Sequence, residues 1–173
     1  MSTRWLDDEQ LRAWVGLAAV MELLPRVLDT QLRRDAGLTH FDYFVLAMLS
    51  EAPDRTLRMT ALAQRTSATL PRLSHVVRRL EERGFVERFP CPDDGRATNA
   101  RLTGAGWDKV VASAPGHVET VRAHVIDALS REQLTQLRAI TDAVLRRIDP
   151  DGTITSAFRP VDAGDGAAPA TGP

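Results

Sequence analysis

Apolar residues recur every three or four positions in the first part of the chain, over about residues 8–34. This spacing is typical of one face of an amphipathic helix. Asp7 followed by Gln10 predicts a capping box at its start, and Gly37 predicts its end. Pro25 removes one backbone hydrogen bond and is expected to bend the helix. The stripe consists of Leu11, Trp14, Val15, Ala18, Met21, Pro25, Leu28 and Leu32.

The middle of the chain breaks into shorter segments. A second helix is predicted to begin after Thr39, and a brief strand over 56–58 follows it. A helix of about eight residues around 60–65, a polar break at 66–69 and a helix over 70–83 come next. Two short helices joined by a tight turn are the helix-turn-helix pattern. The second of these helices is expected to bury Leu73, Val76, Val77 and Leu80.

Two alternating segments follow. Gly84 is predicted to cap the preceding helix, residues 85–89 and 98–102 read as strands, and the turn-forming residues 90–95 lie between them. A helix-turn-helix followed by a β-hairpin is a winged helix. The predicted fold class is therefore mainly α with a small β-hairpin wing.

The last third of the chain is predicted to be helical and then unstructured. Thr103 caps a helix that is expected to break or bend near Pro115-Gly116. Ser130 and Gln133 form a capping box before a final helix with heptad-like apolar spacing. Residues 150–173 are rich in Gly, Pro and Ala and are expected to form a disordered tail.

The terminal helices carry apolar stripes that one small winged helix cannot bury. An exposed stripe of that length favours aggregation, and a two-fold dimer would cover it. We therefore expect an N-terminal dimerisation helix (1–36), a winged helix-turn-helix DNA-binding domain (37–106), C-terminal dimerisation helices (107–149) and the tail (150–173).

Composition excludes several classes of protein. With 43% hydrophobic residues among 173, the chain is not disordered as a whole. Its longest apolar runs are far too short to cross a membrane, and the first residues lack a secretory signal, so a cytoplasmic location is expected. The single cysteine, Cys91, permits no internal disulfide and no thiolate-rich zinc site, and is expected to be a solvated free thiol. His117 and His124 share a helical face but have no third ligand, so neither a metal nor a cofactor is predicted.

The charge distribution indicates a polyanionic partner. The stretch from Arg55 to Arg101 holds ten arginines and five acidic residues, within a chain whose formal net charge is −1. A basic island of this kind is the electrostatic footprint of nucleic acid. The predicted helix over 70–83 turns polar side chains outward, and the predicted contacts to double-stranded DNA are Arg72, Ser74, His75, Arg78 and Arg79. Arg78, Arg79 and Arg83 lie further along the helix and are expected to hold phosphate, or to pair with Glu81 and Glu82 on a solvated face.

The hairpin tip supplies the second predicted contact. Arg96 has the chemistry to enter a minor groove, and Asp94, two residues earlier, could hold its guanidinium in position. A plain polar hairpin loop is the alternative.

Several stretches of the chain resemble the MarR (multiple antibiotic resistance regulator) family of winged-helix transcription factors. They are residues 61–65, 77–88, and 94–96 leading to 102–106. The resemblance implies a homodimer bound to a pseudo-palindromic operator, with Arg96 as the wing arginine and Asp94 as the acid that orients it. It also implies a repressor that is released when a small aromatic effector binds.

Five residues are candidates to line the effector pocket: Trp14, Met21, His40, Phe44 and Met48. Simple core packing is the alternative for all of them. No nucleophile elbow, phosphate-binding glycine loop or paired His and carboxylate is present, so an enzyme is not predicted. A winged helix that contacts only proteins, and a DNA-binding regulator without an effector, remain alternatives.

Overall fold

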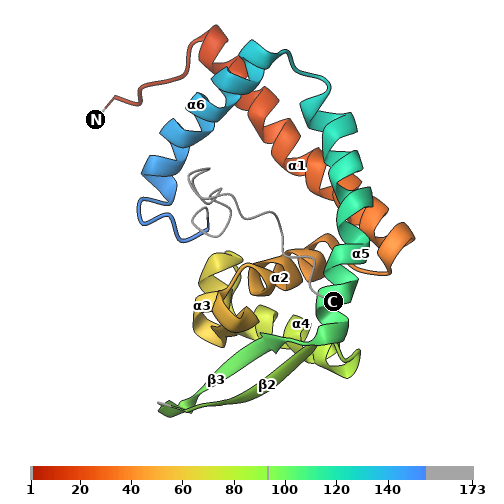
Figure 1. Cartoon of the computed structure of the whole chain (residues 1–173). Helices are drawn as coiled ribbons and strands as arrows, with labels where there is room; N and C mark the ends of the chain where they lie inside the picture. Colours follow the sequence, from red (N-terminus) through yellow and green to blue (C-terminus); the bar gives the residue numbers. More distant parts are fainter. Residues whose placement is uncertain (1, 93, 155–173) are drawn as a thin grey trace, which may run out of the picture.

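The computed structural model describes residues 2–92 and 94–154, and the predicted tail from residue 155 onward lies outside this part. The winged helix occupies one end of the molecule, and a frame of long helices extends from it (Figure 1). In chain order the elements are α1 (Asp8–Ala36), α2 (His40–Ser50), η1 (Pro53–Arg55), β1 (Thr56–Arg58), α3 (Met59–Arg65), α4 (Leu70–Glu82), β2 (Val86–Cys91), β3 (Asp94–Leu102), α5 (Gly104–Val121), η2 (Arg122–Ile126) and α6 (Arg131–Ile148). The predicted fold class, a mainly helical chain with a small β wing, is confirmed.

The local signals at the helix ends act as predicted. The Asp7 side chain accepts from the Gln10 amide and the Gln10 side chain accepts from the Asp7 amide, which completes the capping box of α1. Ser130 and Gln133 form the same box at α6. Gly37 ends α1 with a left-handed φ of 61°, a conformation that costs glycine little.

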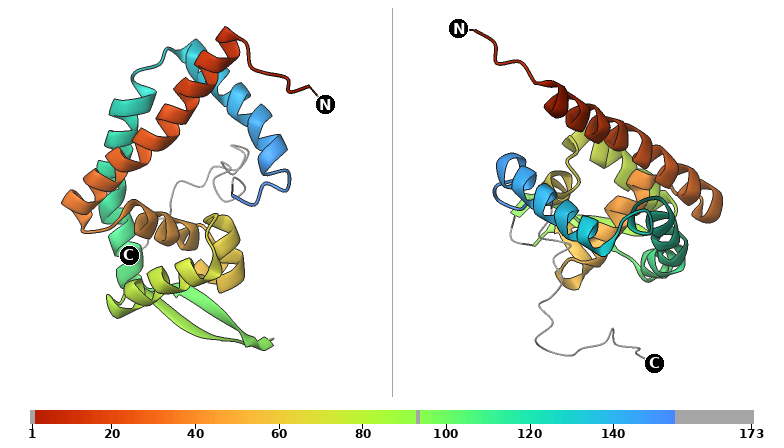
Figure 2. Two further views of the ribbon diagram at one scale, coloured as in Figure 1. Left: turned by 180° about the vertical axis from the view of Figure 1, so that it is seen from behind. Right: turned by 90° about the horizontal axis from the view of Figure 1, so that it is seen from above.

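Of the break or bend predicted near Pro115-Gly116, the break is wrong, and the bend stays a prediction. α5 runs through both residues to Val121, and the backbone changes only in the π-helical turn η2. At Gly116 the helix lies close to α1, where an added Cβ would be 3.1 Å from Nε2 of Gln31. α1 likewise continues without interruption through Pro25. Figure 2 shows α1 and α5 packed along each other near α2.

The three strands form an antiparallel sheet in the order β1-β3-β2. The turn of the hairpin is shorter than predicted, because β2 extends to Cys91 and β3 begins at Asp94. Pro90 is tolerated in β2 because that strand lies at the edge of the sheet, and the register shifts next to it. The Cys91 thiol is free but buried, which corrects the expectation of a solvated side chain.

The hydrophobic core lies within the winged helix, between α2, α3, α4 and the sheet. Its fully buried side chains include Val45, Leu46, Met48, Leu49, Leu62, Leu73, Val77 and Leu80. The buried residues of α1 are confined to its C-terminal part, from Leu28 onward, and the described side chains of α6 include no buried one. Among residues 2–92 and 94–154, no helix has the length and apolarity needed to span a membrane.

Candidate nucleic-acid interface

Helix α4 presents a polar face to solvent because its apolar face is buried. Leu73, Val76, Val77 and Leu80 are buried as predicted. The hydroxyl of Thr69 caps the helix by accepting from the amide of Arg72 at 3.4 Å. The side chains of Arg72, His75 and Arg78 are exposed, and Ser74 is half-buried. Four of the five predicted DNA-contacting residues of α4 therefore lie on its outer side, and Arg79 is the exception.

The exposed arginines of α4 are lightly restrained. Arg72 lies over the Phe41 ring of α2, with Cζ 4.4 Å from the ring centroid. Nη2 of Arg78 is 3.3 Å from Nδ1 of His75, and its Nε is 4.0 Å from a carboxylate oxygen of Glu82. Exposed ion pairs at this distance contribute little, so these cations remain available to a polyanion.

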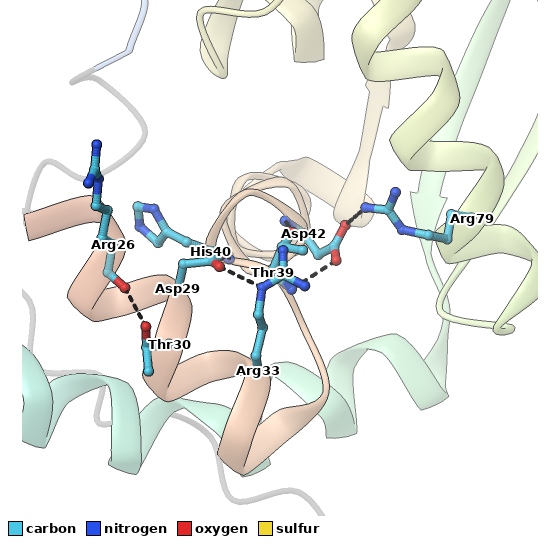
Figure 3. Close-up of polar contacts among 8 residues, drawn as sticks. All are labelled: Arg26, Asp29, Thr30, Arg33, Thr39, His40, Asp42 and Arg79. Carbon is cyan, nitrogen blue, oxygen red and sulfur yellow. Dashed lines mark hydrogen bonds and ion pairs between the residues drawn. The ribbon is translucent and has the colours of Figure 1, made fainter. Parts of the chain in front are cut away.

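Arg79 differs from its neighbours because its guanidinium turns inward (Figure 3). Nη2 of Arg79 donates to Oδ1 of Asp42, near the start of α2. The Asp42 side chain is 3% exposed and that of Arg79 is 39% exposed. The predicted DNA contact of Arg79 stays a prediction, and its guanidinium is already engaged within the chain.

The wing tip carries an exposed cation. Oδ1 of Asp94 accepts from the backbone amide of Arg96 at 3.1 Å, and Oδ2 lies 4.0 Å from Nη1 of Arg58. Asp94 thus orders the turn through the backbone of Arg96, whereas its expected contact with the guanidinium is not among the bonds of the described residues. The Arg96 side chain is exposed at the hairpin end.

A groove of about 210 Å³ joins the wing to the start of α4. It is lined by Arg58, Met59, Thr60, Leu70, Ser74, Arg88, Arg96, Ala97 and Thr98. Sequence reasoning missed Arg58 and Arg88 as members of this surface. Their place in the basic island was the available signal, but their orientation depends on the strand pairing.

Ion pairs within the wing redistribute the positive charge. Nη2 of Arg88 lies 2.6 Å from Oε2 of Glu81, and this hydrogen bond holds the Glu81 pKa below its ordinary value. Nε of Arg101 lies 2.6 Å from Oε1 of Glu87. These pairs neutralise two arginines at the base of the hairpin, whereas Arg72 and Arg96 are exposed and have no ion-pair partner among the described residues.

The predicted effector-pocket residues do not come together within the chain. Trp14 and Met21 are each 52% exposed on α1, whereas Met48 is fully buried in the winged-helix core. Core packing is thus the role that the structure gives to Met48. His40 and Phe44 are half-buried. His40 borders a groove of about 370 Å³, together with Pro25, Arg26, Asp29, Thr30 and Phe41.

A histidine pair at the junction of α1, α2 and α5 was not predicted. The His40 and His117 rings are stacked with centroids 6.2 Å apart, and Tyr43 lies 4.7 Å from His117. Burial lowers the pKa of both histidines, and their mutual repulsion adds to the effect at His117. No local sequence signal reveals this contact, because the two residues lie on different helices.

Comparison with known proteins gives consistent matches. The model of the MarR family matches residues 38–98. The chain is 43% identical to Sco3205, a MarR family transcriptional regulator from Streptomyces coelicolor solved in complex with DNA; the match covers 86% of this chain and 93% of that one, with a TM-score of 0.81. AbsC, a MarR family regulator from the same organism, is 39% identical, with coverage of 86% and 97% and a TM-score of 0.77. The transcriptional repressor YetL of Bacillus subtilis is 30% identical over 74% of this chain and 75% of its own length.

Proposed function

The chain belongs to the MarR family of winged-helix transcriptional regulators, whose members are not enzymes, and from this premise we propose that it acts as a homodimer on a pseudo-palindromic DNA operator. In this proposal α4 enters the major groove, and the hairpin places Arg96 in the adjacent minor groove. Double-stranded DNA is the partner, read by Arg72, Ser74, His75 and Arg78.

One observation carries the DNA-binding proposal: α4 and the wing arginine border the same groove. Ser74 and Arg96 both line the 210 Å³ groove. A single duplex lying across it would meet the start of α4 and the hairpin tip together. Helix N-termini and exposed guanidinium groups are the donors that phosphates favour.

The exposed apolar faces of α1 and α6 support the homodimer. The large apolar side chains exposed on these helices are Leu11, Trp14, Val15, Leu17, Val20, Met21, Leu23, Leu137, Ile140, Val144 and Ile148. A second copy presents the same stripes and covers them by two-fold symmetry. Such a dimer would place its two α4 helices about 34 Å apart, on successive major grooves.

Repression and release by an effector complete the proposal. The name of YetL, a transcriptional repressor, supports repression. The groove beside His40 lies between α1, which carries the dimer face, and α2 of the winged helix. A small aromatic acid bound there would alter the angle between the two parts. Salicylate is a suitable probe, and the expected result is weaker DNA binding at saturating salicylate.

Selection from a random duplex library tests the DNA-binding proposal. The protein is expected to enrich a sequence with two-fold symmetry, and its affinity for that duplex is then measured at increasing salt. If six or more phosphates are engaged, affinity falls by about 10³-fold or more between 50 and 200 mM salt. A winged helix that contacts only proteins would enrich no sequence and show no such salt dependence.

A further inference from the structure

The first turn of α2 holds an unusual carboxylate. Among the described residues, Asp42 is the one charged residue that is buried. Its Oδ2 accepts from the Thr39 amide at 2.9 Å, and its own amide donates to the Thr39 hydroxyl at 2.9 Å. These two bonds form the capping box of α2. Its other oxygen, Oδ1, receives Arg79 from α4.

Helix capping alone does not call for this charge. The other two capping boxes in the described part of the chain, at α1 and α6, use a neutral glutamine at the same position, Gln10 and Gln133. Both of those boxes are exposed. Burying a carboxylate is unfavourable unless it is paired. The negative charge of Asp42 is therefore compensated by Arg79, which lies 37 residues further along the chain.

Helix α4 contacts the first turn of α2 through two arginines. Arg72 covers Phe41, and Arg79 reaches Asp42. The two arginines are seven residues apart, which places them on one side of α4, two turns from each other. An open groove of about 530 Å³ lies between the helices and is lined by Asp29, Arg33, Thr39, Phe41, Arg72, His75, Val76 and Arg79.

The same turn of α2 is held by α1 through a separate carboxylate (Figure 3). Oδ1 of Asp29 accepts from the His40 amide at 2.9 Å, and Oδ2 of Asp29 lies 2.5 Å from Nε of Arg33. Asp29 thus ties α2 to α1, whereas Asp42 ties α2 to α4. Both carboxylates accept a hydrogen bond from a backbone amide at the start of α2. They differ in their arginine partner, which comes from α1 for Asp29 and from α4 for Asp42.

We propose that Asp42 is a positioning residue for DNA recognition, which holds Arg79 and so fixes the orientation of α4 on the winged helix. The inference rests on the proposed function, because it concerns how well α4 discriminates an operator from other DNA. Asp42 itself is covered and touches no DNA. Arg79 acts through the placement of α4 and not on a phosphate.

Neutralising Asp42 has two opposite consequences. It frees α4 to shift, which weakens binding to the selected operator. It also releases the Arg79 guanidinium toward solvent, which adds one cation to the DNA-facing surface and strengthens binding to any duplex. The ratio of operator affinity to unrelated-duplex affinity therefore falls, while the salt dependence becomes steeper.

The test uses the full chain, a duplex selected by the wild-type protein from a random library, and a shuffled duplex of equal length. Asp42→Asn keeps an acceptor for the Thr39 amide and removes the charge. We expect the affinity ratio to fall about tenfold and the salt slope on the shuffled duplex to rise by about one phosphate. Asp29→Asn is the matched control, because it makes the same charge change at the same turn without contacting α4. Its ratio is expected to stay within about twofold of wild type.

Arg79→Gln is the second variant and tests the same contact from the α4 side if Asp42→Asn does not fold, because it leaves the capping box of α2 intact and supplies an amide that can still donate to Asp42. Its ratio is expected to fall, with the salt slope unchanged. The affinity ratio of the double variant is expected to be no lower than that of Arg79→Gln alone, because the two substitutions remove the same contact.

Three outcomes would overturn the positioning role: an unchanged ratio in folded Asp42→Asn, an equal fall in Asp29→Asn, or a salt slope one phosphate lower in Arg79→Gln. Failure of the wild-type protein to select any duplex would instead reject the proposed function.

Discussion

The winged helix and the terminal helices use similar amphipathic patterns with opposite results. In the winged helix, Leu46, Leu62, Leu80 and their neighbours are fully enclosed by the chain itself. On α6 and the N-terminal part of α1, side chains such as Trp14 and Ile140 remain exposed. Both regions begin with well-formed capping boxes. Local helix signals are thus equally good in the two regions, and only one region has its packing partner within the chain.

Because of this difference, we expect the winged helix to determine the stability of the single chain and the terminal helices to determine its association. The region that closes its own core can position a DNA-binding surface on a rigid base. The region that leaves its stripes open gains its packing energy only when something covers them. Substitutions in the two regions should therefore show different dependences on protein concentration.

A core truncation should give the largest effect. Leu46→Ala removes a fully buried side chain from α2 and leaves a cavity. We expect the free energy of unfolding to fall by about 2–5 kcal/mol, measured by chemical denaturation.

Leu23→Ala is the matched control, the same substitution at a site 59% exposed on α1. At a protein concentration where the chain is monomeric it should cost less than about 1 kcal/mol. An equal loss in both variants would mean that the α1 stripe is covered within the chain.

A charge in the open stripe should act on assembly. Ile140 is 60% exposed on α6, so an aspartate there is tolerated by the isolated chain. Buried in an interface without a partner, it should weaken the dimer by about 2 kcal/mol or more, measured by sedimentation velocity at several concentrations.

Arg138→Asp introduces the same residue on the opposite side of α6 and serves as the control. The helical signal in circular dichroism should persist for both variants. If Ile140→Asp remains as dimeric as Arg138→Asp, the α6 stripe is not the interface.

The elements themselves were predictable because their signals are local. Capping residues, Gly37 and the apolar spacing of α4 act within a few positions, and the structure confirms them. The break expected at Pro115-Gly116 is absent, since α5 continues through both residues and lies close to α1 there. Cys91 is the last residue of β2 and is buried, whereas it was expected in a solvated turn.

The site was predictable only in its outward-facing part. The apolar face of α4 dictates which residues point away, so Arg72, His75 and Arg78 could be named from spacing. The partners of Arg79 and His40 could not, since Asp42 and His117 come from other helices. Contacts of that kind depend on how helices cross, which periodicity does not encode.

Loss of the wing cation should affect function without touching either packing region. Arg96→Ala removes an exposed guanidinium at the hairpin tip. Operator affinity is expected to fall by about 1–3 kcal/mol with the melting temperature unchanged, measured by binding titration and thermal denaturation.

Arg101→Ala is the control within the same hairpin, because its guanidinium is already paired with Glu87. It should change affinity by less than about 0.5 kcal/mol. Comparable losses in the two variants would place the DNA contact along the whole hairpin and not at its tip.

The smallest effect is expected at the seam between the two regions, where His40 stacks on His117. Burial lowers the pKa of both imidazoles below 6.5, although Asp29 partly opposes this at His40. The unfolded chain therefore binds protons more readily than the folded chain. The free energy of unfolding is unaffected by these two histidines well above pH 6.5, and it declines as the pH falls through 6.5. His117→Gln should reduce the drop in melting temperature between pH 7.5 and 5.5. His124→Gln makes the same substitution at an exposed residue of η2 and is the control for the change of residue type. If His117→Gln melts with the full wild-type pH dependence, the burial of His117 does not cause the loss of stability at low pH.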